Sequence, residues 1–358
     1  MRRAQPAVGA RALGDRAVGT LAVSTQAVRR STEEEAVHAV QVAELGGPEV
    51  LRWVELDDPV PGPNDLVVEV AAAGLNFIDT YQRSGLYPMK LPYTPGSEGA
   101  GIVEAVGADV ERFAVGDRVA WSGAMGSNAE KVRVPAHLAV AVPAGVELDV
   151  AAAVMLQGMT AHFLVTDTYP LRTGDRCLVH AAAGGVGLLL TQMSKIRGAE
   201  VFATVGSDAK AELARQAGAD HVVNYSETDF GAAVEAIAGP KALQVVYDGV
   251  GAAVFERSLE LLARRGMMVT FGNASGPVEP VLPLLLSRLG SLYLTRPTLG
   301  DYIATRDELV ARSGEIFAWM GAGRLDVRVG ARVPLADTAE AHRMLAGRQT
   351  TGKVLLVP

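Results

Sequence analysis

The sequence predicts an α/β protein in which a doubly wound parallel sheet is inserted into a smaller β-rich domain. Two observations predict this fold class. With 358 residues, the chain exceeds the ~250 residues at which a single hydrophobic core stops growing, which indicates two domains. Its rhythm also changes twice, from short strands before about Gly145 to alternating strands and helices from Arg176, and to mixed pieces after about Pro297.

The first part of the fold consists of short strands separated by proline and glycine. Apolar and polar residues alternate from residue 36 onward, which predicts antiparallel strands in a partly open β domain. The expected strands are 38–45, 50–56, 66–74, 100–107, 116–121 and pieces of 129–143.

The middle of the chain has the rhythm of a parallel sheet. Apolar residues at helical spacing fill 148–167, and six strand candidates with helix-length spacers follow at 176–181, 200–205, 221–225, 243–248, 266–272 and 291–295. That number and spacing predict a doubly wound sheet. A helix at 301–320, a strand near Val327, a helix at 336–345 and a strand at 353–357 are expected to complete the first domain. The expected boundaries are therefore 36–160 plus 298–358 for the β-rich domain and 161–297 for the inserted one.

Composition excludes several classes of protein. The net charge of −7 argues against nucleic acid as a main partner. A single cysteine, Cys177, rules out an internal disulfide and fits the cytoplasm. Apolar runs are interrupted before the ~20 residues of a membrane span. Residues 1–35 are expected to be a disordered extension, and a transit peptide is the alternative, because six arginines oppose only Asp15 in the first 32 residues.

The strongest local motif is AAAGGVG at 181–187, between an apolar strand and an amphipathic helix. Gly184 lets the backbone approach a pyrophosphate, Gly187 permits close packing of helix on strand, and the N-terminus of the helix attracts the anion. The expected cofactor contacts are Gly184, Gly185, Val186 and Gly187. Ala182 replaces the first glycine of the usual Rossmann fingerprint, so a glycine-rich turn without a ligand is the alternative.

The end of the next strand predicts NADPH as the cofactor rather than NADH. An NAD site places a carboxylate there for the ribose diol, whereas this chain has Gly206 and Ser207 followed by Lys210. Ser207 and Lys210 suit a 2′-phosphate, and the hydroxyl of Tyr225 completes the set. The alternative is that Asp208 binds the ribose and that Lys210 is only a solvated helix residue.

Seven sequence blocks carry a family resemblance. They are GLNFIDTYQRSGLYP at 74–88, PGSEGAGIVEAVG at 95–107, AAAGGVG, VGSDAK at 205–210, VVYDGVG at 245–251, FGNASG at 271–276 and LTRPTL at 294–299. From about Val37 to Pro358 the chain resembles the zinc-independent quinone oxidoreductases, the zeta-crystallin-like group of the medium-chain dehydrogenase/reductase superfamily. The resemblance implies a GroES-like catalytic domain around the Rossmann domain.

The resemblance also implies roles for individual residues. It puts Asn76 and Tyr81 beside the nicotinamide, and it makes Thr160 the start of the helix that supports it. Ser207, Lys210 and Tyr225 would surround the 2′-phosphate. The implied contacts to the rest of the cofactor are Phe271 and Asn273 at the nicotinamide ribose, and Arg348 from the last helix. The alternatives are a turn cap for Asn76, a core position for Phe271 and a solvated cation for Arg348.

No catalytic metal is expected. The zinc enzymes of the superfamily have an early catalytic cysteine and a histidine in the segment corresponding to PGSEGAG, where this chain has Ser97, and no cysteine precedes Cys177. Cys177 is expected to be a buried apolar residue. His162 and His180 belong to no cluster at metal-ligand spacing and are expected to be packed or surface residues.

Without a metal, the simplest chemistry is hydride donation to an electron-poor acceptor, and a small quinone is the expected substrate. Tyr81 and Tyr87 are expected near the carbonyl oxygen as orienting donors or proton sources, with packing in the cleft wall as the alternative. The alternative functions are an enoyl or alkenal reductase and, more remotely, a non-catalytic NADPH- or RNA-binding protein. A homodimer is expected through the apolar sixth strand at 291–295, which would otherwise be an exposed edge.

Overall fold

The parallel sheet is present as expected in the computed structural model. The structure describes residues 36–358, and the extension expected at 1–35 lies outside the described residues. The strands of the parallel sheet are β8 (Arg176–Val179), β9 (Glu200–Val205), β10 (His221–Asn224), β11 (Leu243–Asp248), β12 (Leu262–Thr270) and β13 (Tyr293–Thr295). They pair in parallel in the order β10-β9-β8-β11-β12-β13, so all six predicted strands are confirmed. The chain reverses its direction of winding between β8 and β11, which is the switch point where such sheets bind ligands.

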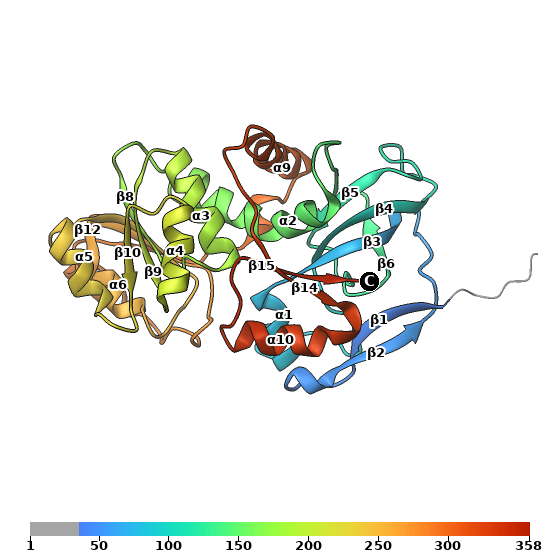
Figure 1. The fold of residues 1–358 in the computed structure, drawn as a ribbon, viewed down its shortest axis with the longest axis horizontal. Helices are drawn as coiled ribbons and strands as arrows, with labels where there is room; N and C mark the ends of the chain where they lie inside the picture. Colours follow the sequence, from blue (N-terminus) through green and yellow to red (C-terminus); the bar gives the residue numbers. More distant parts are fainter. Residues whose placement is uncertain (1–35) are drawn as a thin grey trace, which may run out of the picture. The chain divides into compact units, whose positions relative to one another are not determined.

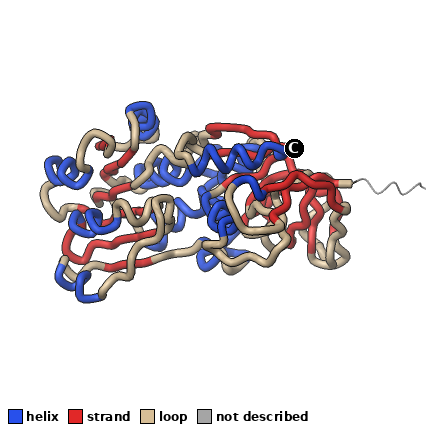
Figure 2. Tube along the Cα trace, turned by 90° about the horizontal axis from the view of Figure 1, so that it is seen from below, coloured by secondary structure: helices blue, strands red, loops and turns tan. Residues whose placement is uncertain are grey.

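Helices cover both faces of this sheet (Figures 1 and 2). One face carries α3 (Gly185–Ile196) and α4 (Asp208–Gln216), and the other carries α5 (Phe230–Ala238) and α6 (Phe255–Leu261). Side chains alternate between the two faces, as the pleat requires: Val201 and Ala203 belong to one core cluster, and Phe202 to the other. Both faces are therefore buried, which explains the continuous apolar runs in the sequence.

A second sheet of seven strands forms the β-rich part. Its order is β14-β15-β3-β4-β5-β7, and β6 pairs with β3. The strands are β3 (Asp65–Leu75), β4 (Glu98–Val106), β5 (Arg118–Ser122), β6 (Lys131–Pro135), β7 (Ala139–Ala141), β14 (Val329–Pro334) and β15 (Lys353–Val357), and β1 (Val37–Val42) pairs with β2 (Leu51–Leu56) as a separate hairpin. β15 pairs with β3, as Figure 1 shows, so the chain returns to its first sheet after the insertion. The strands predicted to be antiparallel, from residue 36 to about Gly145, pair only in antiparallel fashion, whereas β14 and β15 of the returning segment are parallel to each other.

A long helix joins the two sheets. α2 (Leu148–Phe163) continues as a π-helical turn (Leu164–Thr168) and packs on β3, β4, β5 and α3. This 21-residue stretch is long and apolar enough to cross a membrane, but 72% of its apolar window is buried inside the protein, as in a core helix. Asp149, Gly158 and Asp167 interrupt this stretch, which is the kind of interruption from which no membrane-spanning helix was expected.

The remaining elements include α1 (Phe77–Ser84), which the sequence patterns did not predict, and α7 (Pro283–Arg288), which lies in the helix-length spacer before the sixth strand. The helix expected at 301–320 is divided into α8 (Leu299–Tyr302) and α9 (Arg306–Gly321), because Thr305 and Glu308 form a capping box that starts a new helix. α10 (Thr338–Ala346) confirms the last predicted helix, and 3-10 turns lie at Pro48–Val50 and Leu335–Asp337.

Candidate active site

A cavity of about 590 Å³ lies at the carboxyl ends of the parallel strands. Its wall on that side is made by the residues that directly follow the six strands: His180 after β8, Gly206 after β9, Tyr225 after β10, Gly249 after β11, Phe271 after β12 and Arg296 after β13. The β-rich part supplies the opposite wall, with Asn76, Tyr81 and Tyr87. The cavity therefore occupies the switch-point crevice, where α/β proteins bind nucleotides.

The glycine-rich turn leads from β8 into the cavity. Gly184 is the N-cap of α3, so the free N–H groups of that helix face the crevice. A Cβ at residue 187 would stand within 2.8 Å of the backbone of Ala182, so only glycine fits there. Ala182 is fully buried and donates its N–H to the carbonyl oxygen of Thr204 at 3.0 Å. An alanine is therefore accommodated at the position of the missing glycine.

Two cations meet at the end of β9. The Nζ of Lys210 donates to the carbonyl oxygen of Arg348 at 2.7 Å, and burial together with the Arg348 charge lowers the pKa of Lys210. Within residues 36–358 neither cation forms a salt bridge with a carboxylate. Both line the cavity beside Tyr225, whose hydroxyl lies so close to Gly206 that a Cβ there would be only 2.7 Å away. The cluster therefore has positive charge that no carboxylate of residues 36–358 neutralises, which makes it suitable for binding an anion.

Ser207 and Asp208 have local roles beside this cluster. Ser207 is the N-cap of α4 and accepts from the N–H of Lys210 at 3.4 Å, and it does not line the cavity. The carboxylate of Asp208 accepts from Asn224 Nδ2 at 3.1 Å, which turns it toward β10. This geometry disfavours Asp208 as a ribose ligand.

Asn76 and Thr160 differ from their expected settings. Asn76 is 3% exposed and is held by hydrogen bonds on both sides of its carboxamide, to Glu98, Gly74, Lys353 and Gln157, so it is more than a turn cap. Thr160 does line the cavity, but the expectation that it starts a helix is wrong. It lies in the last turn of α2, where its hydroxyl donates to the Leu156 carbonyl at 2.7 Å.

Two phenols and a guanidinium form the end of the cavity near the β-rich part. Tyr81 Oη accepts from the backbone N–H of Asn273 at 3.0 Å, and Tyr87 Oη accepts from Arg296 Nη2 at 3.5 Å. The two rings make an edge contact with centroids 5.4 Å apart. Because each phenol oxygen accepts a hydrogen bond from the protein, its own O–H is available to donate into the cavity. Burial raises the pKa of Tyr81, which keeps it protonated.

The structure thus brings most of the predicted residues to one cavity, and it adds others. The lining set contains Asn76, Tyr81, Tyr87, Thr160, Gly184, Gly185, Val186, Gly187, Lys210, Tyr225, Phe271 and Arg348, whereas Ser207 and Asn273 lie just outside it. Phe271 is half-buried: it packs against Gly249 and against the adjoining core, and it also lines the cavity. Sequence reasoning missed Arg296 and Gln157. The signal for Arg296 was its place in LTRPTL, directly after the sixth strand.

The histidines and the cysteine are packed, as expected. Both ring nitrogens of His180 lie 2.8 Å from hydroxyls, those of Thr204 and Ser258, and burial lowers its pKa to about 3. Burial likewise raises the pKa of the Cys177 thiol to about 12. Within the described range 36–358, no group of three His, Cys, Asp or Glu residues is placed to hold a metal ion.

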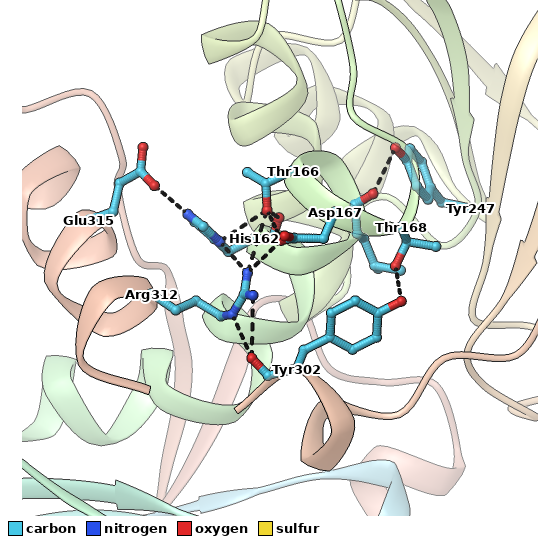
Figure 3. A network of polar contacts seen from close by, with 9 residues as sticks. His162, Thr166, Asp167, Thr168, Tyr247, Tyr302, Arg312 and Glu315 are labelled. Carbon is cyan, nitrogen blue, oxygen red and sulfur yellow. Dashed lines mark hydrogen bonds and ion pairs between the residues drawn. The ribbon is translucent and has the colours of Figure 1, made fainter. Parts of the chain in front are cut away.

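His162 belongs to a polar network between α2 and α9 (Figure 3). Arg312 Nη1 lies 2.7 Å from its Nδ1, so this nitrogen is the acceptor, and Nε2 donates to Glu315 at 2.8 Å. Arg312 also pairs with Asp167 at 3.0 Å. With both ring nitrogens engaged, His162 has a structural role at the joint between the two helices.

Two family models match the chain, and their positions agree with the two sheets. The alcohol dehydrogenase GroES-like domain matches residues 62–144, and the zinc-binding dehydrogenase family matches residues 185–309. Together with the switch-point crevice, they define a member of the medium-chain dehydrogenase/reductase superfamily.

Similarity to individual proteins identifies the family within this superfamily. The chain is 47% identical to a quinone oxidoreductase of Pseudomonas aeruginosa over 89% of its own length and 99% of the relative's. The crystal structure of the Escherichia coli quinone oxidoreductase complexed with NADPH is similar at a TM-score of 0.88 with 44% identity, covering 90% of this chain and all of that one. A 2-haloacrylate reductase from Burkholderia is 38% identical over 90% of this chain and 99% of the relative's. The chain belongs to the zeta-crystallin-like quinone oxidoreductase family.

Proposed function

We propose that the protein is an NADPH-dependent quinone reductase that transfers a hydride to a small quinone without a metal. The observation that carries the cofactor assignment is the Lys210 and Arg348 pair at the end of β9, two cations without a carboxylate partner in residues 36–358. A 2′-phosphate supplies the missing negative charge. The NADPH complex of the Escherichia coli relative supports the same cofactor.

The residues of the crevice fit the rest of the cofactor. The N-terminus of α3, with Gly184 and Gly187, provides N–H donors for a pyrophosphate. NADPH supplies the hydride when bound. Phe271 and the α2 residues that line the cavity, Leu156, Gln157 and Thr160, would hold its nicotinamide end in a fixed orientation.

Tyr81 and Tyr87 then orient the acceptor. Both phenols line the cavity and accept a hydrogen bond from the protein, so each can donate its own proton to a carbonyl oxygen that gains negative charge. Arg296 strengthens Tyr87 as a donor, because a cation that donates to the phenol oxygen polarises its O–H bond. The absence of a metal is supported by Ser97 at the position of the zinc enzymes' histidine.

The experiment is an acceptor panel of quinones, enals, enoyl thioesters and alcohols with NADPH or NADP⁺ under matched conditions. A benzoquinone or naphthoquinone should have the highest kcat/KM. The second candidate is reduction of an activated alkene, which the similarity to 2-haloacrylate reductase favours. If an alkene is preferred and Tyr87→Phe abolishes its reduction alone, Tyr87 is an acid catalyst and the second candidate replaces the first. Elemental analysis of active protein should find far less than one zinc per chain.

Three further statements belong to the proposal. The protein forms a homodimer through the edge strand β13. Tyr293 on this strand is 51% exposed, and the adjacent α7 region exposes Leu282 and Leu284. Light scattering tests the homodimer, and a monomer mass contradicts it.

The domains divide at 160/161 and 297/298, although the first boundary falls inside α2. The protein works in the cytoplasm, which cell fractionation tests.

A further inference from the structure

A chain of four side chains connects a buried ion pair to the cavity. Glu98 on β4 and Lys353 on β15 are 0% and 1% exposed and form an ion pair with each other. Asn76, which precedes α1, contacts both of them. Gln157 on α2 contacts Asn76 and lines the cavity.

The ion pair fixes the direction of the Asn76 carboxamide. Asn76 Nδ2 donates to Glu98 Oε1 at 2.6 Å, and Asn76 Oδ1 accepts from Lys353 Nζ at 2.9 Å. A carboxylate only accepts and an ammonium only donates, so the reversed amide would face two mismatched partners in a buried setting. The second N–H of Asn76 donates to the Gly74 carbonyl at 3.1 Å. Both N–H groups of the Asn76 carboxamide are therefore used, and only its oxygen, Oδ1, can bind the neighbouring side chain of Gln157.

Asn76 in turn fixes the direction of Gln157. Gln157 Nε2 donates to Asn76 Oδ1 at 3.0 Å, which leaves its carbonyl oxygen, Oε1, on the other side. This oxygen is buried and has no hydrogen-bond partner within residues 36–358. It also lies so close to Gly185 that a Cβ on residue 185 would clash with it. A buried acceptor without a donor is unfavourable. Because Gln157 and Gly185 both line the cavity, a ligand bound there can supply the donor.

We propose that Gln157 positions the cofactor, with its Oε1 accepting a hydrogen bond from the nicotinamide riboside half of NADPH. Glu98 and Lys353 are then positioning residues that act on the cofactor through Asn76 and Gln157. This inference rests on the proposed function, since it takes NADPH as the ligand of the cavity. The nicotinamide riboside offers two kinds of donor, the ribose hydroxyls and the carboxamide N–H groups, whereas the 2′-phosphate and pyrophosphate oxygens are acceptors.

Equilibrium binding to Gln157→Leu tests the assignment. The Kd of NADPH should rise about 5- to 15-fold, the ratio expected for one buried hydrogen bond. The Kd of 2′,5′-ADP should not change, because this fragment lacks the nicotinamide riboside. Gln216→Leu is the matched control, since Gln216 is exposed on α4 and, within residues 36–358, its side chain hydrogen-bonds only to Glu212.

A cofactor analogue separates the two kinds of donor. The 3-acetylpyridine analogue of NADP⁺ has no carboxamide N–H. If Gln157→Leu weakens NADP⁺ and the analogue equally, the donor is a ribose hydroxyl; if it weakens NADP⁺ alone, the donor is the carboxamide. Both results support the assignment of Gln157.

Two further variants test the chain of contacts. Gln157→Glu places a carboxylate against Asn76 Oδ1, so NADPH binding should weaken more at pH 8 than at pH 5.5, where protonation restores a donor. The double variant Glu98→Gln with Lys353→Met removes the charges and should weaken NADPH but not 2′,5′-ADP.

Several results would overturn the inference. Unchanged NADPH affinity in Gln157→Leu, or equal losses for NADPH and 2′,5′-ADP, would leave Gln157 a structural residue. Unchanged NADPH affinity in a folded double variant would show that Glu98 and Lys353 do not act on the cofactor. If the double variant does not fold, the Gln157 variants alone decide whether Gln157 contacts the cofactor. Failure of the wild-type protein to bind NADPH would instead contradict the proposed function.

Discussion

Replacing Lys210 by alanine should remove the preference for NADPH. Lys210 Nζ lies 2.7 Å from the Arg348 carbonyl and is already partly shielded from water, which lowers its pKa. The Arg348 carbonyl thus already replaces part of the hydration of Lys210, and a bound phosphate would replace more of it. A charge-assisted hydrogen bond of this kind contributes ~1.5–3 kcal/mol, so kcat/KM with NADPH should fall about 10- to 100-fold.

The assay compares kcat/KM for NADPH and NADH with one quinone at fixed ionic strength. Activity with NADH should change less than about threefold in Lys210→Ala, because NADH has no 2′-phosphate. Lys241→Ala is the control, since Lys241 is exposed and precedes β11, at the end of the strand opposite the cavity. Equal use of the two cofactors by the wild-type enzyme, or an unchanged ratio in Lys210→Ala, would refute the assignment of this site.

Three further predictions concern the phenols, the nucleotide turn and a buried carboxyl. Tyr81→Phe and Tyr87→Phe should each lower kcat for the quinone about tenfold without changing the Kd of NADPH; steady-state kinetics and titration check both, and a change in Kd alone would count against a role in orienting the acceptor. Gly187→Val should abolish NADPH binding because its side chain meets the backbone of the turn, whereas Gly145→Ala, which has open space around it, should bind normally in calorimetry. Burial raises the pKa of Asp79 to about 7, so the folded protein keeps a proton that the unfolded chain releases near pH ~4. This retained proton stabilises the folded protein relative to the unfolded chain. The stabilisation is complete below pH ~4 and is lost as the pH rises through 7. Asp79→Asn should therefore lose less unfolding free energy than the wild type between pH 5 and pH 8 in urea denaturation, and parallel pH slopes would contradict the assigned pKa.

Elements whose signal is local were predictable from the sequence. The strands of the parallel sheet are short apolar runs bounded by glycine and polar turns, and both of their faces are buried, so the run itself is the signal. The turn at 181–187 was predictable for the same reason, since a strand, a glycine-rich turn and a helix follow one another directly.

Other elements depend on tertiary contacts that no local pattern contains. α1 was missed because its buried residues, Asp79, Thr80 and Arg83, are polar and so resemble a solvated segment. The parallel pairing of β14 with β15 depends on the path of α10 between them, and strand direction leaves no mark on the alternation of side chains.

The contacts among the buried polar side chains Glu98, Lys353 and Asn76 could not be predicted from the sequence for a similar reason. Glu98 and Lys353 stand in apolar strands 255 residues apart, and each alone looks like an exposed residue of a strand edge. Their pairing, and the contact of both with Asn76, exist only after β4 and β15 are placed on either side of β3. The family resemblance gave Thr160 a role at the start of a helix. A resemblance of this kind identifies a residue, but it does not say where the helix that contains the residue begins, and Thr160 lies in the last turn of α2.

The choice of acceptor follows from the protonation chemistry of the cavity. Carbon protonation, which the reduction of an alkene requires, is most efficient with an acid whose pKa lies near the operating pH. Among the described residues that line the cavity, His180 has both ring nitrogens engaged and a pKa lowered to about 3, and the pKa of Tyr81 is raised. Asp79, with a pKa of about 7, does not line the cavity. The lining donors are therefore suited to hold a negative oxygen rather than to protonate a carbon, and a quinone, whose reduced anion takes its proton from water, is the acceptor that needs no more than this.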